Sequence, residues 1–270
     1  MFIKRLLASL VMAAIGIPAI IFGGIFYFLL IAFFILVASW EYVKIFERSN
    51  YSPSMVITVG GVFLILVSRS YFPQASSGLL TALILFAMTA HLIAFEKGKD
   101  TAATDFTITL GGILYLGWLG AYLLELRSLP QGLWWLFLTL GSVWIADSAA
   151  YFIGSKYGRH KLSPRLSPKK SWEGYFAGVF FGTLGSIGLA LAFHAWGGLQ
   201  VTWWQGGLLG LVLTVFTTLG DIGESMIKRQ AGVKDSSNII PGHGGFLDRI
   251  DAWLWAAAIG YFMIIGLFIG

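Results

Sequence analysis

Residues 6–40 read LLASLVMAAIGIPAIIFGGIFYFLLIAFFILVASW, a run of 35 residues without a charged side chain between Arg5 and Glu41. A membrane-spanning helix needs about 20 apolar residues, so this run is too long for one span. We predict two helices that break near Gly23 and Gly24. A basic start before an apolar run is also typical of a signal peptide, but this run continues far beyond the usual apolar region of about 7 to 15 residues. We therefore expect an uncleaved first helix.

The composition of the whole chain agrees with this interpretation. Of the 270 residues, 57% are hydrophobic and 11% are charged, against about 45 to 50% and about 25% in an average soluble domain. Too few polar side chains remain to cover a soluble globule, so lipid must surround much of the surface. The absence of Cys excludes disulfides and Cys-based metal sites. The net charge of +5 lies in short loops rather than on a soluble basic face, and we expect no nucleic-acid partner.

Other uncharged intervals predict the remaining spans. Residues 174–220 form a second run of 47 uncharged residues, which again requires two helices, with a break around Gly197 and Gly198. Five further spans are expected over residues 55–72, 78–95, 107–124, 132–153 and 252–270. The chain is thus predicted to be an all-α, polytopic integral membrane protein with about nine transmembrane helices in a single membrane domain, residues 1–270.

The basic residues set the predicted orientation. Lys and Arg collect in the cytoplasmic loops of membrane proteins. With a cytoplasmic N-terminus, the predicted spans place all of the 18 Lys and Arg residues there except Arg69 and Arg127. A miscounted span would spoil this alternation, so the asymmetry supports the predicted count and a cytoplasmic N-terminus.

Polar residues are concentrated in the second half of the chain. Residues 1–130 have short, ordinary loops and are predicted to be mainly helical scaffold. Residues 131–270 contain two long polar segments, 154–174 and 222–251, both predicted to be cytoplasmic, and acidic residues lie in or beside the adjoining apolar spans. We therefore expect residues 131–270 to be the catalytic half.

Asp147 lies inside an otherwise apolar stretch, residues 142–153. An ionised carboxylate near the centre of a membrane helix costs about 2.5 to 3.5 kcal/mol. A metal ion, a basic loop or a hydrogen bond from Tyr151, four residues on, could compensate it. Alternatively, Asp147 lies close enough to the cytoplasmic interface to be hydrated.

Asp221 ends the 47-residue uncharged run and starts a polar stripe. Glu224, Ser225 and Lys228 follow it at spacings of three, four and seven residues. If the helix continues through them, these side chains share one face that points away from lipid.

A glycine-rich loop precedes the last span. Gly244 and Gly245 allow a backbone conformation that approaches a ligand closely and offers N–H groups to phosphate oxygens. His243 could donate to phosphate or only hold the loop. Asp248 and Asp251 follow, three residues apart on one helix face. Such carboxylates beside a glycine loop suit Mg²⁺ held between protein oxygens and substrate phosphates.

Several nearby cations fit a polyanionic ligand better than a metal ion alone. They are Lys169, Lys170, Lys228, Arg229 and Lys234. A basic face beside the membrane could also bind only anionic lipid headgroups, but that alternative leaves the carboxylates unexplained.

Other functional classes of protein fit the sequence less well. The P-loop, dinucleotide-binding, Gly-x-Ser-x-Gly and His-Glu-x-x-His motifs are absent. A secondary transporter would place polar residues along a path through both leaflets, whereas here they lie on one predicted side of one half. A structural subunit would not need the acidic glycine loop. The Asp-Gly-x-x-Ala-Arg pattern of membrane enzymes that act on CDP-alcohols is also absent.

Residues 225–251 resemble the signature of the phosphatidate cytidylyltransferase family, the CDP-diacylglycerol synthases. The resemblance rests on SMIKR at 225–229, KD at 234–235 and IPGHGGFLDRID at 240–251. A second block is similar to the same family, with DSAAY at 147–151, KLSP at 161–164 and SPKKSWEG at 167–174, as is Gly220-Asp221. The N-terminal spans match the family only in their hydrophobic character.

The resemblance implies that CTP and phosphatidic acid react to give CDP-diacylglycerol and pyrophosphate, with Mg²⁺ required and a second cation left open. From the residues themselves we predict metal ligation by Asp221 and Asp248, with Asp147 and Asp251 as further catalytic carboxylates. The predicted contacts to the substrate phosphates are Lys169, Lys170, Ser225, Lys228, Arg229, Lys234, His243, Gly244, Gly245 and Arg249. We expect a bacterial inner (cytoplasmic) membrane protein that contacts membrane lipid, with the active site facing the cytoplasm. A homodimer is left open.

Overall fold

The computed structural model describes residues 14–237, 239 and 244–269, and helices dominate it. The main elements are α2 (Gly24–Glu47), α3 (Met55–Tyr71), α4 (Ser76–Glu96), α5 (Ala102–Gly112), α6 (Leu119–Ser128), α7 (Gly132–Tyr157), β1 (Lys161–Ser163), β2 (Ser167–Ser171), α8 (Trp172–Gly197), α9 (Trp203–Gln230) and α10 (Leu247–Met263). Three short segments adjoin these α-helices. They are the 3-10 helix η1 (Pro73–Ala75) before α4 and the π-helices η2 (Ile113–Trp118), between α5 and α6, and η3 (Ile264–Phe268), after α10. Within this described part, seven helices are long and apolar enough to cross a membrane. The predicted all-α, polytopic membrane fold is confirmed.

The predicted breaks between helices are also confirmed. Gly23 and Gly24 have φ angles of 67° and 53° where α2 begins, and Gly198 has φ 64° at the end of α8. This left-handed conformation favours glycine because it has no Cβ. The first predicted span lies partly outside the described residues, and α3 is a shorter apolar helix of 17 residues. The count of nine spans and the cytoplasmic N-terminus stay predictions.

The chain forms two compact units, each described here by itself. Unit 1 comprises residues 1–125 and 228–250, and unit 2 comprises residues 126–227 and 251–270. Helices α9 and α10 therefore each contribute residues to both units. The functional division into a scaffold and a catalytic half stays a prediction.

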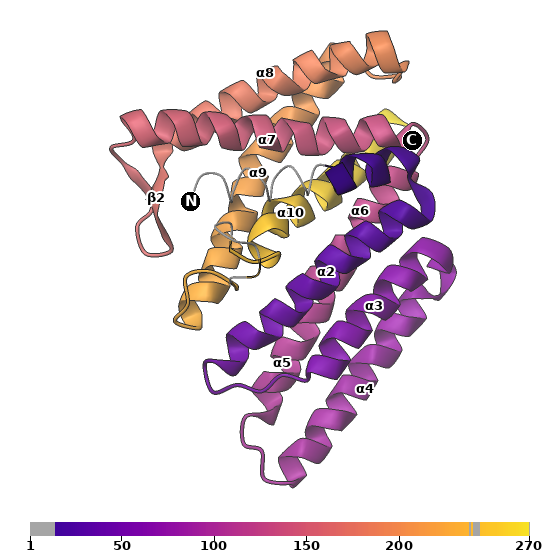
Figure 1. Ribbon diagram of the computed structural model, residues 1–270, viewed down its shortest axis with the longest axis vertical. Coiled ribbons are helices and arrows are strands. Elements are labelled where there is room, and N and C mark those ends of the chain that lie inside the picture. Colours follow the sequence, from indigo (N-terminus) through magenta and orange to yellow (C-terminus); the bar gives the residue numbers. More distant parts are fainter. Residues whose placement is uncertain (1–13, 238, 240–243, 270) are drawn as a thin grey trace. The chain divides into compact units, whose positions relative to one another are not determined.

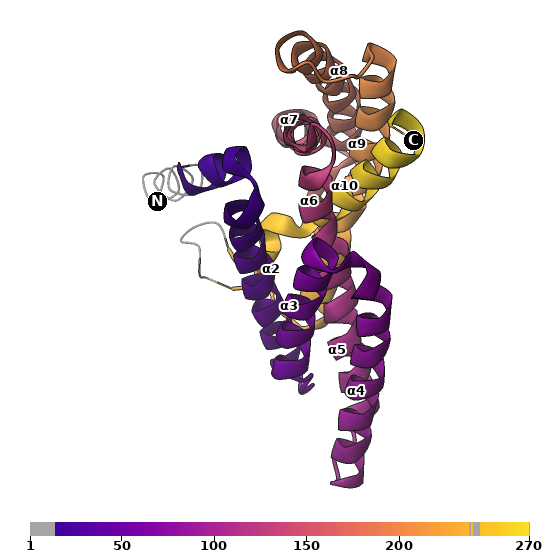
Figure 2. The same cartoon turned by 90° about the vertical axis from the view of Figure 1, so that its right-hand side faces the viewer.

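In unit 1, helices α2 to α5 pack side by side, with α3 in contact with α2, α4 and η2 (Figures 1 and 2). Ser54 caps α3 by accepting the Ile57 N–H at 3.3 Å. The buried Ile65, Leu83 and Ile113 belong to the hydrophobic core that these helices share. Many large apolar side chains instead lie on the surface, as expected of a surface solvated by lipid.

In unit 2, the long helices α7 and α8 run alongside each other (Figure 1). Gly174, Gly178, Gly182, Ser186 and Ala190 recur every four residues and are the buried positions of α8. A helix face of small residues lets two membrane helices approach closely. A Cβ at Gly182 would already crowd Ala146 on α7, at 2.7 Å from its Cβ.

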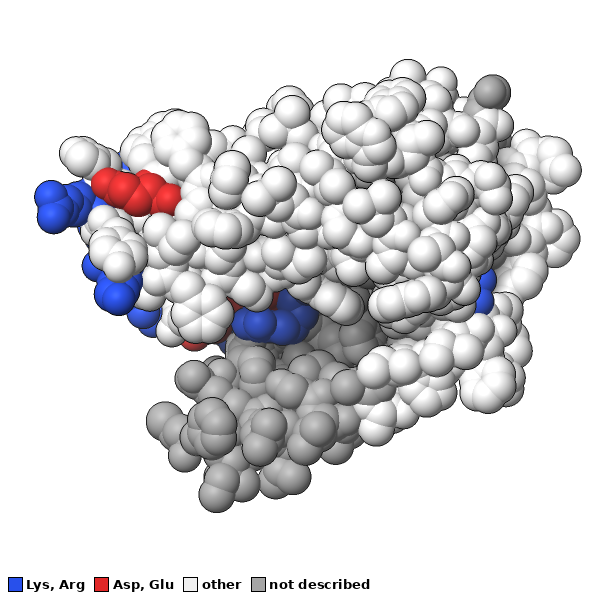
Figure 3. Space-filling model, turned by 90° about the horizontal axis from the view of Figure 1, so that it is seen from above, with Lys and Arg blue, Asp and Glu red and all other residues white. Residues whose placement is uncertain are grey.

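An antiparallel hairpin of β1 and β2 joins α7 to α8, pairing Lys161 with Ser171 and Ser163 with Ser167. The Ser171 hydroxyl accepts the Gly174 N–H at 3.2 Å and so caps α8. The sequence predicted this segment as polar but not as strands. In the view from above, most of the visible described surface is uncharged, and charged side chains gather toward the hairpin end (Figure 3).

Candidate active site

A close approach of α9 and α10 builds the acidic group of unit 2. A Cβ at Gly220 would lie 2.7 Å from the Trp255 ring and 2.9 Å from the Asp251 carbonyl oxygen, so only glycine fits between the two helices. Asp221 follows directly, and its carboxyl group is close enough to interact electrostatically with the Asp251 carboxyl group. Glu224, one helical turn further along α9, is a third acid that interacts with Asp251.

Lys170 and Asp147 complete this group. Lys170 on β2 donates a hydrogen bond to Asp221 Oδ2 and forms an ion pair with it. Asp147 on α7 is near enough to interact electrostatically with both Asp221 and Lys170. Within the described residues, Tyr151 makes no hydrogen bond to Asp147, because its side chain points outward and is 71% exposed. Lys170 of the basic hairpin thus supplies compensating charge, one of the options that the sequence left open. Compensation by a metal ion or by hydration stays a prediction.

This group has the chemistry of a site for a hard cation. Two neighbouring carboxylates repel each other unless a proton or a cation lies between them, and carboxylate oxygens are the ligand atoms that Mg²⁺ prefers. Among the residues that the structure describes, no three His, Asp or Glu side chains form a ready metal site. Mg²⁺ commonly takes only one or two carboxylates and completes its shell with water and substrate phosphates. Asp221 and Asp251 fit that requirement.

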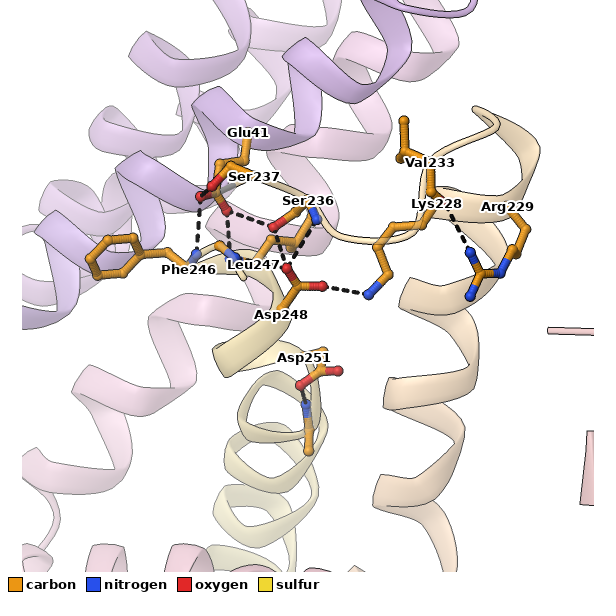
Figure 4. Close-up of polar contacts among 12 residues, drawn as sticks. Glu41, Lys228, Arg229, Val233, Ser236, Ser237, Phe246, Leu247, Asp248 and Asp251 are labelled. Atoms are coloured by element: carbon orange, nitrogen blue, oxygen red, sulfur yellow. Dashed lines mark hydrogen bonds and ion pairs between the residues drawn. The ribbon is translucent and has the colours of Figure 1, made fainter. Parts of the chain in front are cut away.

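Asp248 lies in unit 1, in the first turn of α10, and is held from several directions (Figure 4). Its Oδ2 accepts the Ser236 N–H at 3.0 Å, the Ser236 hydroxyl at 2.7 Å and the Gly245 N–H at 2.8 Å. Its Oδ1 accepts a hydrogen bond from Lys228 Nζ at 2.5 Å. Both side chains are largely buried, with 7% of the Asp248 side chain and 10% of the Lys228 side chain exposed. This is a fixed ion pair rather than a mobile surface contact.

The sequence does not predict a role for Glu41, which marks only the end of the first apolar run. In the structure, Glu41 on α2 is fully buried. Its carboxylate accepts the N–H groups of Phe246 and Leu247 at 3.0 and 2.8 Å, at the start of α10 (Figure 4). It also accepts hydrogen bonds from the Ser236 and Ser237 hydroxyls. The one sequence feature that points to Glu41 is its position directly after 35 uncharged residues. That feature is not specific, because an acid can follow any membrane-spanning helix.

The glycine loop is partly described. Gly244 has φ 81°, and the Gly245 N–H is bonded to Asp248. A Cβ at Gly245 would collide with the Ser236 hydroxyl and with Glu41, so this glycine is needed for close packing. Whether the loop also contacts phosphate stays a prediction. His243 lies outside the described residues.

The other predicted site residues differ in exposure. Ser225 lies on α9, which continues through Gln230 as the polar stripe requires, and is half-buried. The Arg229 side chain bonds the Val233 carbonyl oxygen at 3.1 Å. Among the predicted contacts to the substrate phosphates, the exposed basic residues are Lys169, Arg229, Lys234 and Arg249. Their exposure leaves them available to a ligand.

The predicted metal pair, Asp221 and Asp248, divides between the two units. It stays a prediction, and each carboxylate is described with its own unit. Within unit 2, Asp221 instead has Asp251 as its carboxyl neighbour and Asp147 close by. Three of the four predicted catalytic carboxylates are thus together in one unit.

These features define an integral membrane protein in which α7, β2, α9 and α10 bring acidic and basic side chains together. This arrangement suits a membrane enzyme with a charged substrate. The chain belongs to the cytidylyltransferase family, whose sequence model matches residues 3–267. It is 33% identical to the phosphatidate cytidylyltransferase of Bacillus subtilis, over 97% of each chain. It is 34% identical to that of Pseudomonas aeruginosa, over 95% of this chain and 98% of the relative. The Synechocystis relative of the same name is 31% identical, over 97% of this chain and 96% of its own.

Proposed function

We propose that this protein is a phosphatidate cytidylyltransferase, which converts CTP and phosphatidic acid into CDP-diacylglycerol and pyrophosphate. The observation that carries the proposal is the similarity, over nearly the full length, to several bacterial proteins of that name. The described carboxylates and lysines support it, because the reaction must bring two anionic phosphates together.

In the proposed reaction, a phosphate oxygen of phosphatidic acid attacks the α-phosphorus of CTP. A new P–O bond forms, the bond between the α-phosphorus and its bridging oxygen breaks, and pyrophosphate leaves with that electron pair. A phosphate monoester has a second pKa near 6, so the nucleophile is already largely ionised near neutral pH. The protein therefore needs no strong general base, and its task is to position the phosphates and neutralise their charge.

We propose that Asp221 and Asp251 hold Mg²⁺, with Asp147 close enough to join them, and that Asp248 contributes as the sequence predicts. When bound, the ion would neutralise phosphate charge and stabilise the charge that develops on the leaving pyrophosphate. Lys170 would balance the acids before substrate arrives and then turn to phosphate. Lys228, held by Asp248, would present a fixed positive charge.

We place the protein in the inner membrane of a bacterium, with this site on the cytoplasmic side. The acyl chains of phosphatidic acid would stay in the bilayer while CTP arrives from the cytoplasm. The asymmetry of the basic residues supports this orientation. The proposal involves no nucleic acid, and it holds for a monomer or a homodimer.

The test is a comparison of two labels. Purified protein in detergent or liposomes receives phosphatidic acid, Mg²⁺ and CTP labelled either at the α-phosphate or at the γ-phosphate, and the lipid is extracted. Cytidylyl transfer puts only the α-label into lipid and releases the γ-label as pyrophosphate. A γ-label in the lipid would instead identify a CTP-dependent lipid kinase, and no label in the lipid would contradict both activities.

A further inference from the structure

Glu41 is a fully buried acid, and within the described part of the chain its side-chain hydrogen bonds all go to the segment that carries Asp248. It lies on α2, about 200 residues earlier in the chain than its partners Ser236, Ser237, Phe246 and Leu247. A carboxylate removed from water is costly unless hydrogen bonds satisfy it. Four donors do so here, at distances from 2.5 to 3.0 Å.

The position of Glu41 at the beginning of α10 has an electrostatic consequence. The first N–H groups of a helix have no partner within the helix and form its positive end. Glu41 accepts two of them, from Phe246 and Leu247. Its negative charge therefore fixes where α10 begins, one residue before Asp248.

Ser236 links Glu41 directly to Asp248. Its hydroxyl oxygen lies 3.0 Å from Glu41 Oε2 and 2.7 Å from Asp248 Oδ2. A hydroxyl group has one proton, so Ser236 donates to one carboxylate at a time. Glu41 retains Ser237 and two backbone N–H groups when Ser236 donates to Asp248, and Asp248 retains the N–H groups of Ser236 and Gly245 in the opposite case. Neither acid is left unsatisfied by the exchange.

We propose that Glu41 is a positioning residue of the enzyme: it holds the start of α10 and the 236–237 segment so that Asp248 and its partner Lys228 face the substrate in a fixed geometry. This inference rests on the proposed function. It explains why a Cβ has no room at Gly245, which packs against both Glu41 and Ser236. It also gives a role to the acid that ends the first apolar run.

The experiment measures the α-label assay on Glu41→Gln, alone and combined with Asp248→Asn. Gln keeps the size of the side chain but places an amide N–H₂ group against donors and removes the charge. We expect kcat to fall about 10- to 100-fold, since small misplacements of catalytic groups have such effects. If Glu41 acts through Asp248, Glu41→Gln should cost nothing further in the Asp248→Asn background. A purely structural role would lower activity by the same factor in both backgrounds.

Two variants complete the design. Glu47→Gln is the matched control, because Glu47 lies on the same helix in a more exposed pair with Lys44, and it should keep wild-type kcat. Ser237→Ala removes only one donor to Glu41 and covers the case in which Glu41→Gln does not fold. It should lower kcat about three- to tenfold, again only when Asp248 is intact.

The outcomes are separable. Wild-type kcat in both Glu41→Gln and Ser237→Ala, or equal losses with and without Asp248, would overturn the positioning role while leaving the proposed function standing. Absence of α-label transfer by the wild-type protein would instead remove the proposed function and this inference with it.

Discussion

The carboxyl groups of Asp221 and Asp251 are close enough to interact electrostatically, although 30 positions separate them in the sequence. Gly220 makes this contact available by letting α9 and α10 approach closely at the preceding residue. Lys170 adds an ammonium group to Asp221 from the hairpin. The unit thus combines acids that repel one another with a cation that a substrate phosphate could attract.

Replacing either acid by Asn should nearly abolish turnover. Asp221→Asn and Asp251→Asn keep the size of the side chain but lose the charge that a hard cation needs, so we expect kcat to fall by about two or more orders of magnitude. The double variant should be little worse than either single variant, because residues that act as one unit are not additive. Steady-state kinetics with and without Mg²⁺ measure this, and removing Mg²⁺ should abolish wild-type turnover.

The control for these variants is Asp100→Asn, at an exposed position in unit 1 that should keep wild-type activity. Near-normal, Mg²⁺-dependent turnover in both Asp221→Asn and Asp251→Asn would refute their role. Asp147 and Asp248 would then be the acids to test.

Lys170 and Lys169 are neighbours in the sequence but should differ in effect. Lys170 is half-buried and paired with Asp221, whereas Lys169 is exposed. Lys170→Gln should lower kcat/KM for CTP about tenfold or more, because a partly desolvated charge next to the acids is lost. Lys169→Gln should cost less, and its cost should shrink further at high salt. Equal losses measured across a salt series would show that both lysines act as surface charges.

Gly220 and Gly223 provide a matched pair on α9. A Cβ at Gly220 would crowd Trp255 and the Asp251 backbone, while a Cβ at Gly223 would meet nothing within 4 Å. Gly220→Ala should therefore destabilise the protein by about 1 to 3 kcal/mol through overpacking and lower activity by separating Asp221 from Asp251. Gly223→Ala should fold as well as wild type, since Ala favours helix. Thermal unfolding in detergent and the α-label assay test the pair, and equal behaviour would contradict the close helix approach.

Much of the fold could be predicted from the sequence because a bilayer imposes strict lengths. Uncharged runs must fold into spans of limited length, and the glycines at 23, 24 and 198 mark the breaks where the structure has them. The hairpin was not predicted because its strands are short and polar, with no alternation of apolar residues to reveal them.

The candidate site was only partly predictable. Local spacing can identify acids within a span or a loop, as it did for Asp147, Asp221, Asp248 and Asp251. It cannot show which acids meet, because contacts between distant segments depend on packing. Glu41 illustrates this limit, since its partners lie about 200 residues away. Gly245 was predicted to be a phosphate contact, and the structure gives it a second reason, close packing against Glu41.

The orientation of the chain can be tested with reporters. The asymmetry of the basic residues predicts that a reporter fused after Gly270 is extracytoplasmic and that one inserted near Arg159 is cytoplasmic. Alkaline phosphatase and green fluorescent protein fusions report the two sides. Finding both positions on the same side would contradict the nine-span arrangement.

Cation binding by Asp221 and Asp251 can be measured without turnover, as Mn²⁺ binding followed by electron paramagnetic resonance. Wild-type protein in detergent with CTP should bind Mn²⁺ and lose it in competition with Mg²⁺. Asp221→Asn and Asp251→Asn should each weaken the binding about tenfold or more, while Asp100→Asn should bind as wild type does. Unchanged Mn²⁺ affinity in both Asp221→Asn and Asp251→Asn would show that these two acids do not hold the cation.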